Sequence, residues 1–458
     1  MNKNKTQGKL TSGPVGKTLI KLTIPMIFGM IGMVAFNLTD TYFVGKLGTN
    51  HLAALSFTFP VVFIINSIAL GLGMGASAVI SRAIGEGDQH RVKRLTTDSL
   101  LLAFSIVIGF VIFGLLTIEP LFTLLGAKGQ ILDYIKQYMM IWYIGMPFVV
   151  VPMVGNNAIR ATGDTKTPSL IMMIAAGMNM LLDPLLIFGI GPFPELGIEG
   201  AALATVFSRF TTFTVALWVL AKREKMLTSH FDSFRQIIQS WQTVLFIGIP
   251  IMAARMMIPL TTGIITKLLA DFGPKSVAGY GVASRVEFFA MAVIMSLASV
   301  FGPFIGQNLG AKNITRILKS IKFSSRFAIL WGILLFILLR TFATSIGRIF
   351  NEDKEVVSTI VLYLSIVPIS YGLNGIFQLF NTALNVIKRP YHAAGLIFLQ
   401  MFVIYIPLAN LGAKYWQEKG IFLATMTAYI LGGILSYFVL KFQLRKIITI
   451  HEDADKNV

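Results

Sequence analysis

Long apolar segments, separated by short polar connections, run through the whole chain. Each is long enough to cross the hydrocarbon core of a bilayer, roughly 30 Å, as a helix. Turns that contain glycine, proline or charged residues mark their ends. The pattern predicts an all-α polytopic membrane protein with about twelve spans. They cover residues 16–44, 52–81, 97–125, 132–156, 168–191, 199–221, 242–270, 277–304, 322–346, 357–387, 392–413 and 420–441.

The two halves of the chain resemble each other. Leu22-Thr-Ile-Pro25 recurs as Ile247-Gly-Ile-Pro250, and Gly85-Glu-Gly-Asp88 recurs as Gly310-Ala-Lys-Asn313. Both pairs share one offset of about 225 residues, which chance rarely produces. Each half holds an even number of spans, so both halves enter the membrane in the same orientation, and we expect two six-helix lobes related by a pseudo-twofold axis along the membrane normal. The predicted parts are an N-lobe at 1–221, a cytoplasmic connector at 222–241 and a C-lobe at 242–458.

Composition supports a membrane protein and argues against a nucleic-acid partner. A hydrophobic fraction of 55% with 13% charged residues excludes an ordinary soluble domain. The net charge of +18 comes from basic residues in alternate short loops, not from a basic stripe with interleaved aromatic residues. Lys and Arg are more frequent in the loops on one side of the predicted spans than in those on the other, and both ends of the chain lie on the basic side. This difference predicts that both termini are cytoplasmic. There is no cysteine, which excludes a disulfide framework and a thiolate nucleophile. We expect the first span to insert without cleavage, because the polar N-terminus carries no cleavage signal.

Two acids interrupt otherwise apolar spans. Asp40 lies near the outer end of the first span and Asp183 near the outer end of the fifth. An ionisable residue inside a span indicates a functional site. The repeat pairs Asp40 with Ile265 and Asp183 with about Tyr405, so both acids are confined to the first lobe. A scaffold residue would more often be kept in both halves, so this asymmetry favours function over the alternative that Asp40 only caps its helix.

Asp40 and Asp183 are expected to act as one unit. Two carboxylates in a partly dehydrated site cannot both stay ionised at low cost, because burial and like-charge repulsion each favour the protonated form of one. Such a pair can bind a proton, or a sodium ion if neutral oxygens complete the shell. Asn179, Thr205 and Tyr138 are the candidates for those oxygens. For each of the three, a simple interhelical hydrogen bond is the alternative.

The remaining features of the spans have structural interpretations. The other buried charges are Arg209, Arg255, Arg285 and Glu287. Arg255 and Glu287 fall near the middle of adjacent spans, so we expect them to pair, with a role in coupling as the alternative. The run Gly71-Leu-Gly-Met-Gly75 follows no strand and is interpreted as close helix packing. Pro25 lies in the first turns of span one, where it is expected to act as a hinge.

Several motifs together resemble the multidrug and toxic compound extrusion (MATE) family over essentially the whole chain. They are the duplicated lobes, the early proline of spans one and seven, Thr39-Asp40-Thr41, the Gly85-Glu-Gly-Asp88 turn and the segment from Arg160 to Pro168. The pair Asp40 and Asp183, with Asn179, is similar to the DinF-like branch, which implies proton or sodium coupling in the N-lobe. The NorM-like branch carries acids in spans seven and ten, and residues 356–387 here contain no Asp or Glu. The resemblance therefore does not extend to a cation site in the C-lobe.

The resemblance implies a secondary antiporter that exports amphipathic, often cationic, drugs or toxins in exchange for H⁺ or Na⁺. Protonation of the two acids would let span one bend at Pro25. We expect a substrate cavity lined by Met33, Phe36, Asn37, Asn156 and Asn157. Further expectations are a monomer without cofactor, in contact with lipid in the inner membrane of a prokaryote. The alternatives are a lipid or lipid-linked precursor flippase, a membrane enzyme and a passive channel.

Overall fold

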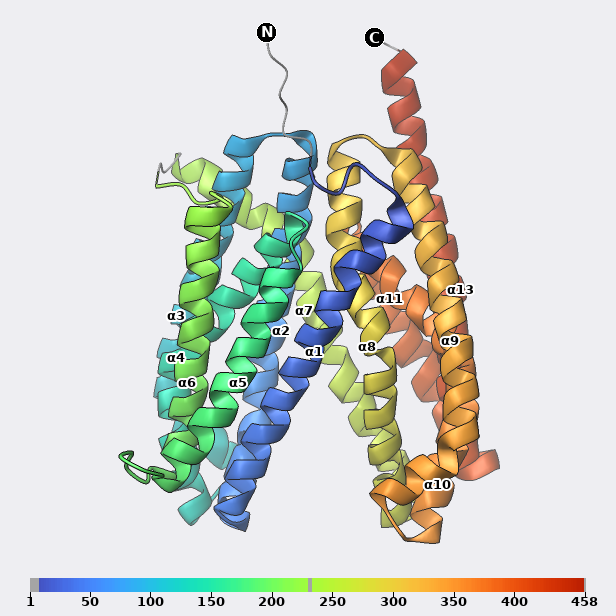
Figure 1. The fold of residues 1–458 in the computed structure, drawn as a ribbon. Helices are drawn as coiled ribbons and strands as arrows, with labels where there is room; N and C mark the ends of the chain where they lie inside the picture. Colours follow the sequence, from blue (N-terminus) through green and yellow to red (C-terminus); the bar gives the residue numbers. More distant parts are fainter. Residues whose placement is uncertain (1–7, 230–232, 457–458) are drawn as a thin grey trace. The chain divides into compact units, whose positions relative to one another are not determined.

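The computed structural model describes residues 8–229 and 233–456, and its regular secondary structure within those ranges is helical (Figure 1). In chain order the helices are α1 (Val15–Lys46), α2 (Thr49–Glu86), α3 (Gln89–Leu124), α4 (Gly129–Ala161), α5 (Lys166–Phe188), α6 (Gly197–Trp218), η1 (Val219–Arg223), α7 (Phe234–Ala270), α8 (Pro274–Gly310), α9 (Ile314–Phe350), α10 (Lys354–Ile366), η2 (Val367–Ser370), α11 (Tyr371–Val386), α12 (Pro390–Phe398), η3 (Leu399–Tyr405) and α13 (Ile406–Lys456).

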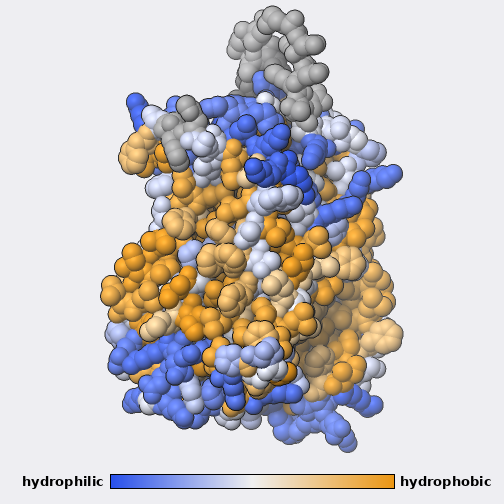
Figure 2. Space-filling model, turned by 60° about the vertical axis from the view of Figure 1, so that its left-hand side comes forward, coloured by the Kyte–Doolittle hydropathy of each residue, from blue (hydrophilic) through white to orange (hydrophobic). Residues whose placement is uncertain are grey.

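Eleven helical stretches of the described residues are long and apolar enough to cross a membrane. The last of them, Pro390–Lys446, is interrupted by non-helical backbone at Trp416 and Gln417. It therefore accounts for the two final spans of the sequence prediction. Figure 2 shows hydrophobic residues over the middle of the visible surface and hydrophilic residues toward its two ends, as expected for side chains that face lipid and water.

The chain folds into two compact units. Unit 1 holds the described residues up to Leu10 and those of Lys21–Ile249, and unit 2 holds Thr11–Ile20 and the described residues from Pro250 onward. Both α1 and α7 thus begin in one unit and end in the other. The start of α7 is anchored in unit 1, where Trp241 Nε1 donates to the carbonyl oxygen of Asp98 at 2.9 Å.

Much of the expected connector is helical. Its first residues belong to η1, and α7 already begins at Phe234, although hydropathy predicted a span only from residue 242. The polar start of α7 is held by side-chain contacts, such as the 3.0 Å bond that Arg94 donates to Gln236, and apolar content could not reveal them. Residues 230–232 of the connector lie outside the described residues.

Glycine lets the helices of unit 1 approach closely. A Cβ atom at Gly73 would lie 2.3 Å from Asn157 Nδ2, and one at Gly75 would lie 2.6 Å from the carbonyl oxygen of Val244. Neither position can accept a side chain without movement of a neighbour. The prediction that this run serves close helix packing is confirmed.

α1 packs along α5 within unit 1. A Cβ atom at Gly29 would lie 3.0 Å from Ser169 Cα, and one at Gly32 would lie 3.3 Å from Met173 Cγ. α1 also stays helical through Pro25, so the expected hinge residue does not interrupt the helix. The missing N–H of a proline removes one backbone hydrogen bond, and a helix can retain the rest of its ladder around that gap.

Candidate functional site

The packing of α1 on α5 brings the two acids of unit 1 together. In the last turns of α1 and α5, the rings of Phe43 and Phe188 meet edge to face with centroids 6.2 Å apart. Asp40 precedes Phe43 by less than one turn, and Asp183 precedes Phe188 by little more than one turn. Their carboxylates lie within electrostatic range of each other, and both act on the hydroxyl of Tyr138 from α4. Residues far apart in the sequence thus form one cluster, which we call the acidic cluster.

Asn179 holds Asp183 in place. The two residues are one turn apart on α5, and both are fully buried. Asn179 Nδ2 donates to Asp183 Oδ1 at 3.0 Å. This bond fixes one carboxylate oxygen and leaves the other available, as the (i, i+4) spacing on a helix allows.

Five buried oxygen atoms on α1, α4, α5 and α6 have no hydrogen-bond partner among the described residues. They are Asp40 Oδ1, Asp183 Oδ2, Asn179 Oδ1, Thr205 Oγ1 and Asn156 Oδ1. Leaving a buried acceptor without a partner costs about 1–3 kcal/mol, so such atoms are rare unless a water, an ion or a proton satisfies them. Four of the five belong to the residues that the sequence predicts for cation coupling.

The chemistry of these donors fits a proton or a sodium ion. Protonation turns a carboxylate oxygen from an acceptor into a donor, which lets one acid bond to a neighbouring oxygen. Carboxylate, amide and hydroxyl oxygens are also the ligands that hard cations prefer. Asp40, Asn179, Asp183 and Thr205 are the residues that would hold such an ion.

The residues expected to line a substrate cavity differ in their exposure and in their hydrogen bonding. Met33 is 38% exposed and Asn37 is exposed as well, whereas Phe36 is buried. Asn156 has a free side-chain oxygen. Asn157 instead donates to the carbonyl oxygen of Met153 at 2.8 Å and packs over a glycine of α2, so its side chain serves helix packing.

Arg209 of α6 is a part of the acidic cluster to which sequence reasoning gave no role. Its guanidinium carbon lies 4.4 Å from the centre of the Phe36 ring, within the range of a cation–π interaction. It also interacts electrostatically with Asp40. A signal was present in the repeat: Gly200, Ala204 and Thr205 recur 220 residues later, and this register aligns Arg209 with a tyrosine.

The expected ion pair between Arg255 and Glu287 is not formed in unit 2, where the described ion pairs do not include it. The Glu287 carboxylate accepts a hydrogen bond from Tyr363 of α10, and its Oε1 accepts one from Tyr429 of α13 at 2.8 Å. The expectation was wrong because residue spacing gives depth in the membrane but not the direction of a side chain around its helix. Tyrosine hydroxyls satisfy this carboxyl group, and it needs no arginine.

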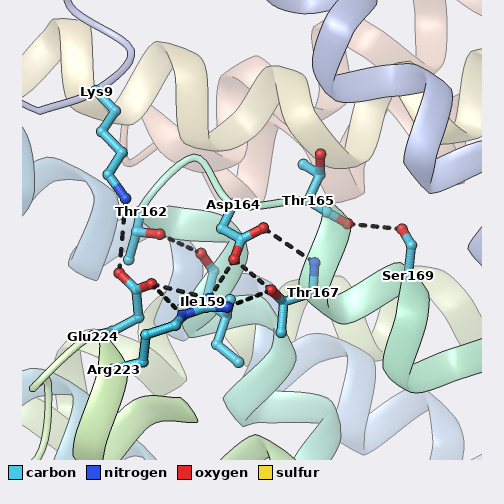
Figure 3. A network of polar contacts seen from close by, with 9 residues as sticks. All are labelled: Lys9, Ile159, Thr162, Asp164, Thr165, Thr167, Ser169, Arg223 and Glu224. Atoms are coloured by element: carbon cyan, nitrogen blue, oxygen red, sulfur yellow. Dashed lines mark hydrogen bonds and ion pairs between the residues drawn. The ribbon is translucent and has the colours of Figure 1, made fainter.

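The segment that carries the Arg160-to-Pro168 motif forms a polar network at the end of unit 1 (Figure 3). The carboxylate of Asp164 accepts a hydrogen bond from the Thr167 backbone N–H at 3.1 Å and one from the Thr167 hydroxyl at 2.6 Å. Arg223 of η1 forms an ion pair with Asp164 and also contacts Glu224. Lys9 reaches Glu224 at 4.0 Å.

The pKa of Asp164 is the net result of opposing effects. Burial raises it, but the hydrogen bonds from Thr167 and the charge of Arg223 together lower it below its ordinary value. The network therefore favours the ionised carboxylate and ties the start of α5 to the segment after α6.

Comparison with known proteins places these features in context. The MatE family model matches residues 25–185 and 250–411. The chain is 39% identical to a protein named FAD transporter from Shewanella oneidensis, over 94% of this chain and 95% of the relative. It is 25% identical to the probable multidrug resistance protein YoeA of Bacillus subtilis, over 96% of both chains. The solved structure of the Vibrio cholerae MATE transporter VcmN in the bent form has a TM-score of 0.90 at 32% identity, covering 94% of this chain and 97% of that one.

These matches confirm the fold expectation. The two matches to one family model begin at Pro25 and Pro250, which are the residues that the internal repeat aligns. The twelve-helix, two-lobe, all-α fold follows from the agreement with VcmN and from the helices of the described chain. The assignment to the DinF-like branch stays a prediction.

The Asp164 network predicts a pH-dependent stability. A carboxyl group with a lowered pKa in the folded state stabilises that state above its unfolded pKa, about 3.9, and this stabilisation is lost as the pH falls through the folded value. Asp164→Asn should therefore lower the melting temperature at neutral pH, and the difference from wild type should shrink below about pH 4. Melting curves in detergent across that range measure it. The exposed acid of α4 provides the control, Asp133→Asn; an equal loss in both variants would contradict the role of the network.

The tyrosine partners of Glu287 predict a specific pattern of coupling. In double-mutant cycles on the melting temperature, Glu287→Gln and Tyr429→Phe should be non-additive, by roughly 0.5–3 kcal/mol, because the two side chains share a hydrogen bond. Glu287→Gln and Arg255→Ala should be additive within about 0.5 kcal/mol. A large coupling with Arg255 and none with Tyr429 would show that the ion pair forms after all.

Proposed function

We propose that this chain, which belongs to the MatE family of transporters, is a secondary antiporter that exports amphipathic compounds in exchange for protons bound at Asp40 and Asp183. Members of this family are transporters and not enzymes, so the enzyme alternative is excluded. The observation that supports the coupling site is that Asp40 and Asp183 interact electrostatically, and that both acids and the adjoining Asn179 keep a buried oxygen atom without a described partner. Neither acid has a counterpart in the second half of the repeat.

The charge of Arg209 favours a proton over a sodium ion. A fixed guanidinium near Asp40 already neutralises part of that carboxylate's charge, and it repels a second cation placed there. A proton avoids this repulsion, because it binds covalently to one oxygen and leaves a neutral group. Sodium remains the alternative, with Asp183, Asn179 and Thr205 supplying the oxygens.

Proton binding can be converted into movement through the packing of α1 on α5. While both acids are ionised, drying their surroundings is costly, because each carboxylate would lose its hydration. Neutralising them removes this cost and lets α1 close more tightly on α5. Changing a two-state population from 1:99 to 99:1 needs about 5.5 kcal/mol. Pro25 lies between the unit 2 start of α1 and its contact with α5, and we propose it as the point at which α1 bends.

The relatives point to two substrate classes. YoeA is named a probable multidrug resistance protein, which supports the export of varied amphipathic drugs. The Shewanella relative is named an FAD transporter, and its identity with this chain, 39%, is considerably higher than the 25% of YoeA. We therefore propose FAD as the second candidate substrate. Its flavin ring is flat and aromatic, and its two phosphates are negatively charged.

The protein is proposed to act as a monomer in the inner membrane of a prokaryote, in contact with lipid and with both termini in the cytoplasm. The charge asymmetry of the loops supports this orientation, because Lys and Arg gather in cytoplasmic connections. The Asp164 network and its neighbour Lys9 then lie on the cytoplasmic side.

Removal of either acid should abolish coupling. In vesicles with a proton gradient, Asp40→Asn and Asp183→Asn should each reduce substrate-dependent proton flux to background, because a neutral amide cannot exchange the proton. The control Asp133→Asn should keep wild-type flux, and size-exclusion profiles should show that all variants fold. Replacing the proton gradient by a sodium gradient tests the alternative ion. Full proton flux in both acidic variants would place the coupling site elsewhere.

Replacing Pro25 should separate binding from coupling. Pro25→Ala restores a helix hydrogen bond and should straighten α1, so substrate still binds but the α1–α5 distance no longer responds to pH. Spin labels on α1 and α5 measure that distance in both variants. The repeat supplies the matched control, since Pro250→Ala changes the equivalent proline of α7 and should leave the response intact. Equal responses in wild type and Pro25→Ala would place the bend at another residue.

A further inference from the structure

Arg209 is a cation inside an apolar span that forms no ion pair with any described residue. In the sequence of α6 it falls between two phenylalanines with exposed rings, Phe207 and Phe210, and its buried Nε atom has no described hydrogen-bond partner. Its described contacts are the face of the Phe36 ring and the electrostatic attraction of Asp40. A charged side chain within a span is costly, and one left incompletely paired indicates a function.

The repeat shows that the scaffold does not require this charge. Gly200, Ala204 and Thr205 align with Gly420, Ala424 and Thr425, and the same register aligns Arg209 with Tyr429. In unit 2 the tyrosine donates a neutral hydrogen bond to Glu287. A polar side chain that interacts with a carboxyl group therefore occupies this position in both units, whereas the positive charge is particular to unit 1.

We propose that Arg209, placed over Phe36, is the residue by which unit 1 recognises the anionic group of an aromatic substrate. The guanidinium offers a planar set of donors that fits a phosphate or carboxylate, and its contact with the buried Phe36 ring holds it in place. The exposed rings of Phe207 and Phe210 on the same helix offer aromatic surface. Phosphorylated flavins combine these two features in one molecule. The inference rests on the proposal that unit 1 binds the transported compound, and it identifies a substrate class.

The charges around Arg209 set the condition for binding an anion. α1 contributes Asp40, α5 contributes Asp183, and α4 contributes the neutral hydroxyl of Tyr138. With both acids ionised, the cluster carries a net charge of one negative unit, and Asp40 attracts the guanidinium. With both protonated, the net charge is one positive unit, and Arg209 is free to bind an anion. The same cluster therefore changes the sign of the charge that it attracts.

The test is an equilibrium titration of three flavins that share one ring system. Riboflavin has no phosphate, FMN has one and FAD has two, and all are followed by flavin fluorescence. The wild-type protein and its variants are placed in phosphatidylcholine nanodiscs at one pH, because a phosphate itself titrates near pH 6. No ion gradient is present, so the result does not depend on coupling.

Wild type should bind FMN and FAD more tightly than riboflavin. Arg209→Gln should weaken FMN and FAD by about tenfold to a hundredfold, the value of a charge-assisted hydrogen bond, and should leave riboflavin unchanged. Arg209→Lys should retain part of the preference, since it keeps the charge but not the planar donors. Asp40→Asn should tighten FMN, by at least about threefold, because it removes the competing carboxylate.

Arg255→Gln is the matched control, because it removes a partly buried arginine from an apolar span of unit 2. It should leave the ratio of FMN to riboflavin affinity as in wild type. The proposal is overturned if Arg209→Gln keeps the wild-type ratio, if Arg255→Gln lowers it equally, or if wild type does not prefer the phosphorylated flavins. The proton-flux measurements on Asp40→Asn and Asp183→Asn are independent of these outcomes, so failure of either proposal can be distinguished from failure of the other.

Discussion

The cost of placing a polar group in an apolar helical interior is the constraint on which both units depend. In unit 2 this cost is offset at Glu287, where tyrosine hydroxyls donate hydrogen bonds to the carboxylate. In unit 1 the cost is offset only in part, since Asp40 and Asp183 each keep an oxygen atom without a described hydrogen-bond partner. A satisfied carboxyl group contributes to stability, whereas an unsatisfied pair is ready to bind something. Unit 2 also has unpartnered oxygens, but they belong to hydroxyl and amide groups, at Ser324, Tyr371, Asn381 and Asn385. The difference between the buried carboxyl groups of the two halves is thus the chemical argument for the proposed coupling in unit 1.

The sequence could predict the features that appear as a pattern of residue types along the chain. The spans follow from apolar length, and the repeat follows from motifs such as Pro25 and Pro250 at a constant offset. Asp40 and Asp183 could be selected together because they break the apolar pattern in one half only. The glycines of α2 were interpreted correctly as well, since small residues within a span have few other uses.

Features that depend on the direction of a side chain around its helix could not be predicted. Arg255 and Glu287 match in depth, yet Glu287 is directed toward tyrosines of α10 and α13. The contact of Arg209 with Phe36 depends on the rotation of α6 relative to α1. Rotation and tilt are set by the packing of neighbouring helices, on which hydropathy carries no information. The polar first turns of α7 were missed for a related reason, because they are held by specific contacts.

The sign of the substrate's charge decides whether protonation of the acidic cluster weakens or strengthens substrate binding. A cation is attracted by the ionised acids and repelled when they are protonated, so proton entry can drive its release. An anion has the opposite preference: it binds better when the acids are protonated, because Arg209 then lacks a counter-charge. An anion also needs less driving force to leave a cell whose interior is negative, since each charge gains about 2.3 kcal/mol per 100 mV. Under the proposed function, a cluster of two acids and one base would couple the export of cations to protons, and it would release anions down the membrane potential without using that coupling.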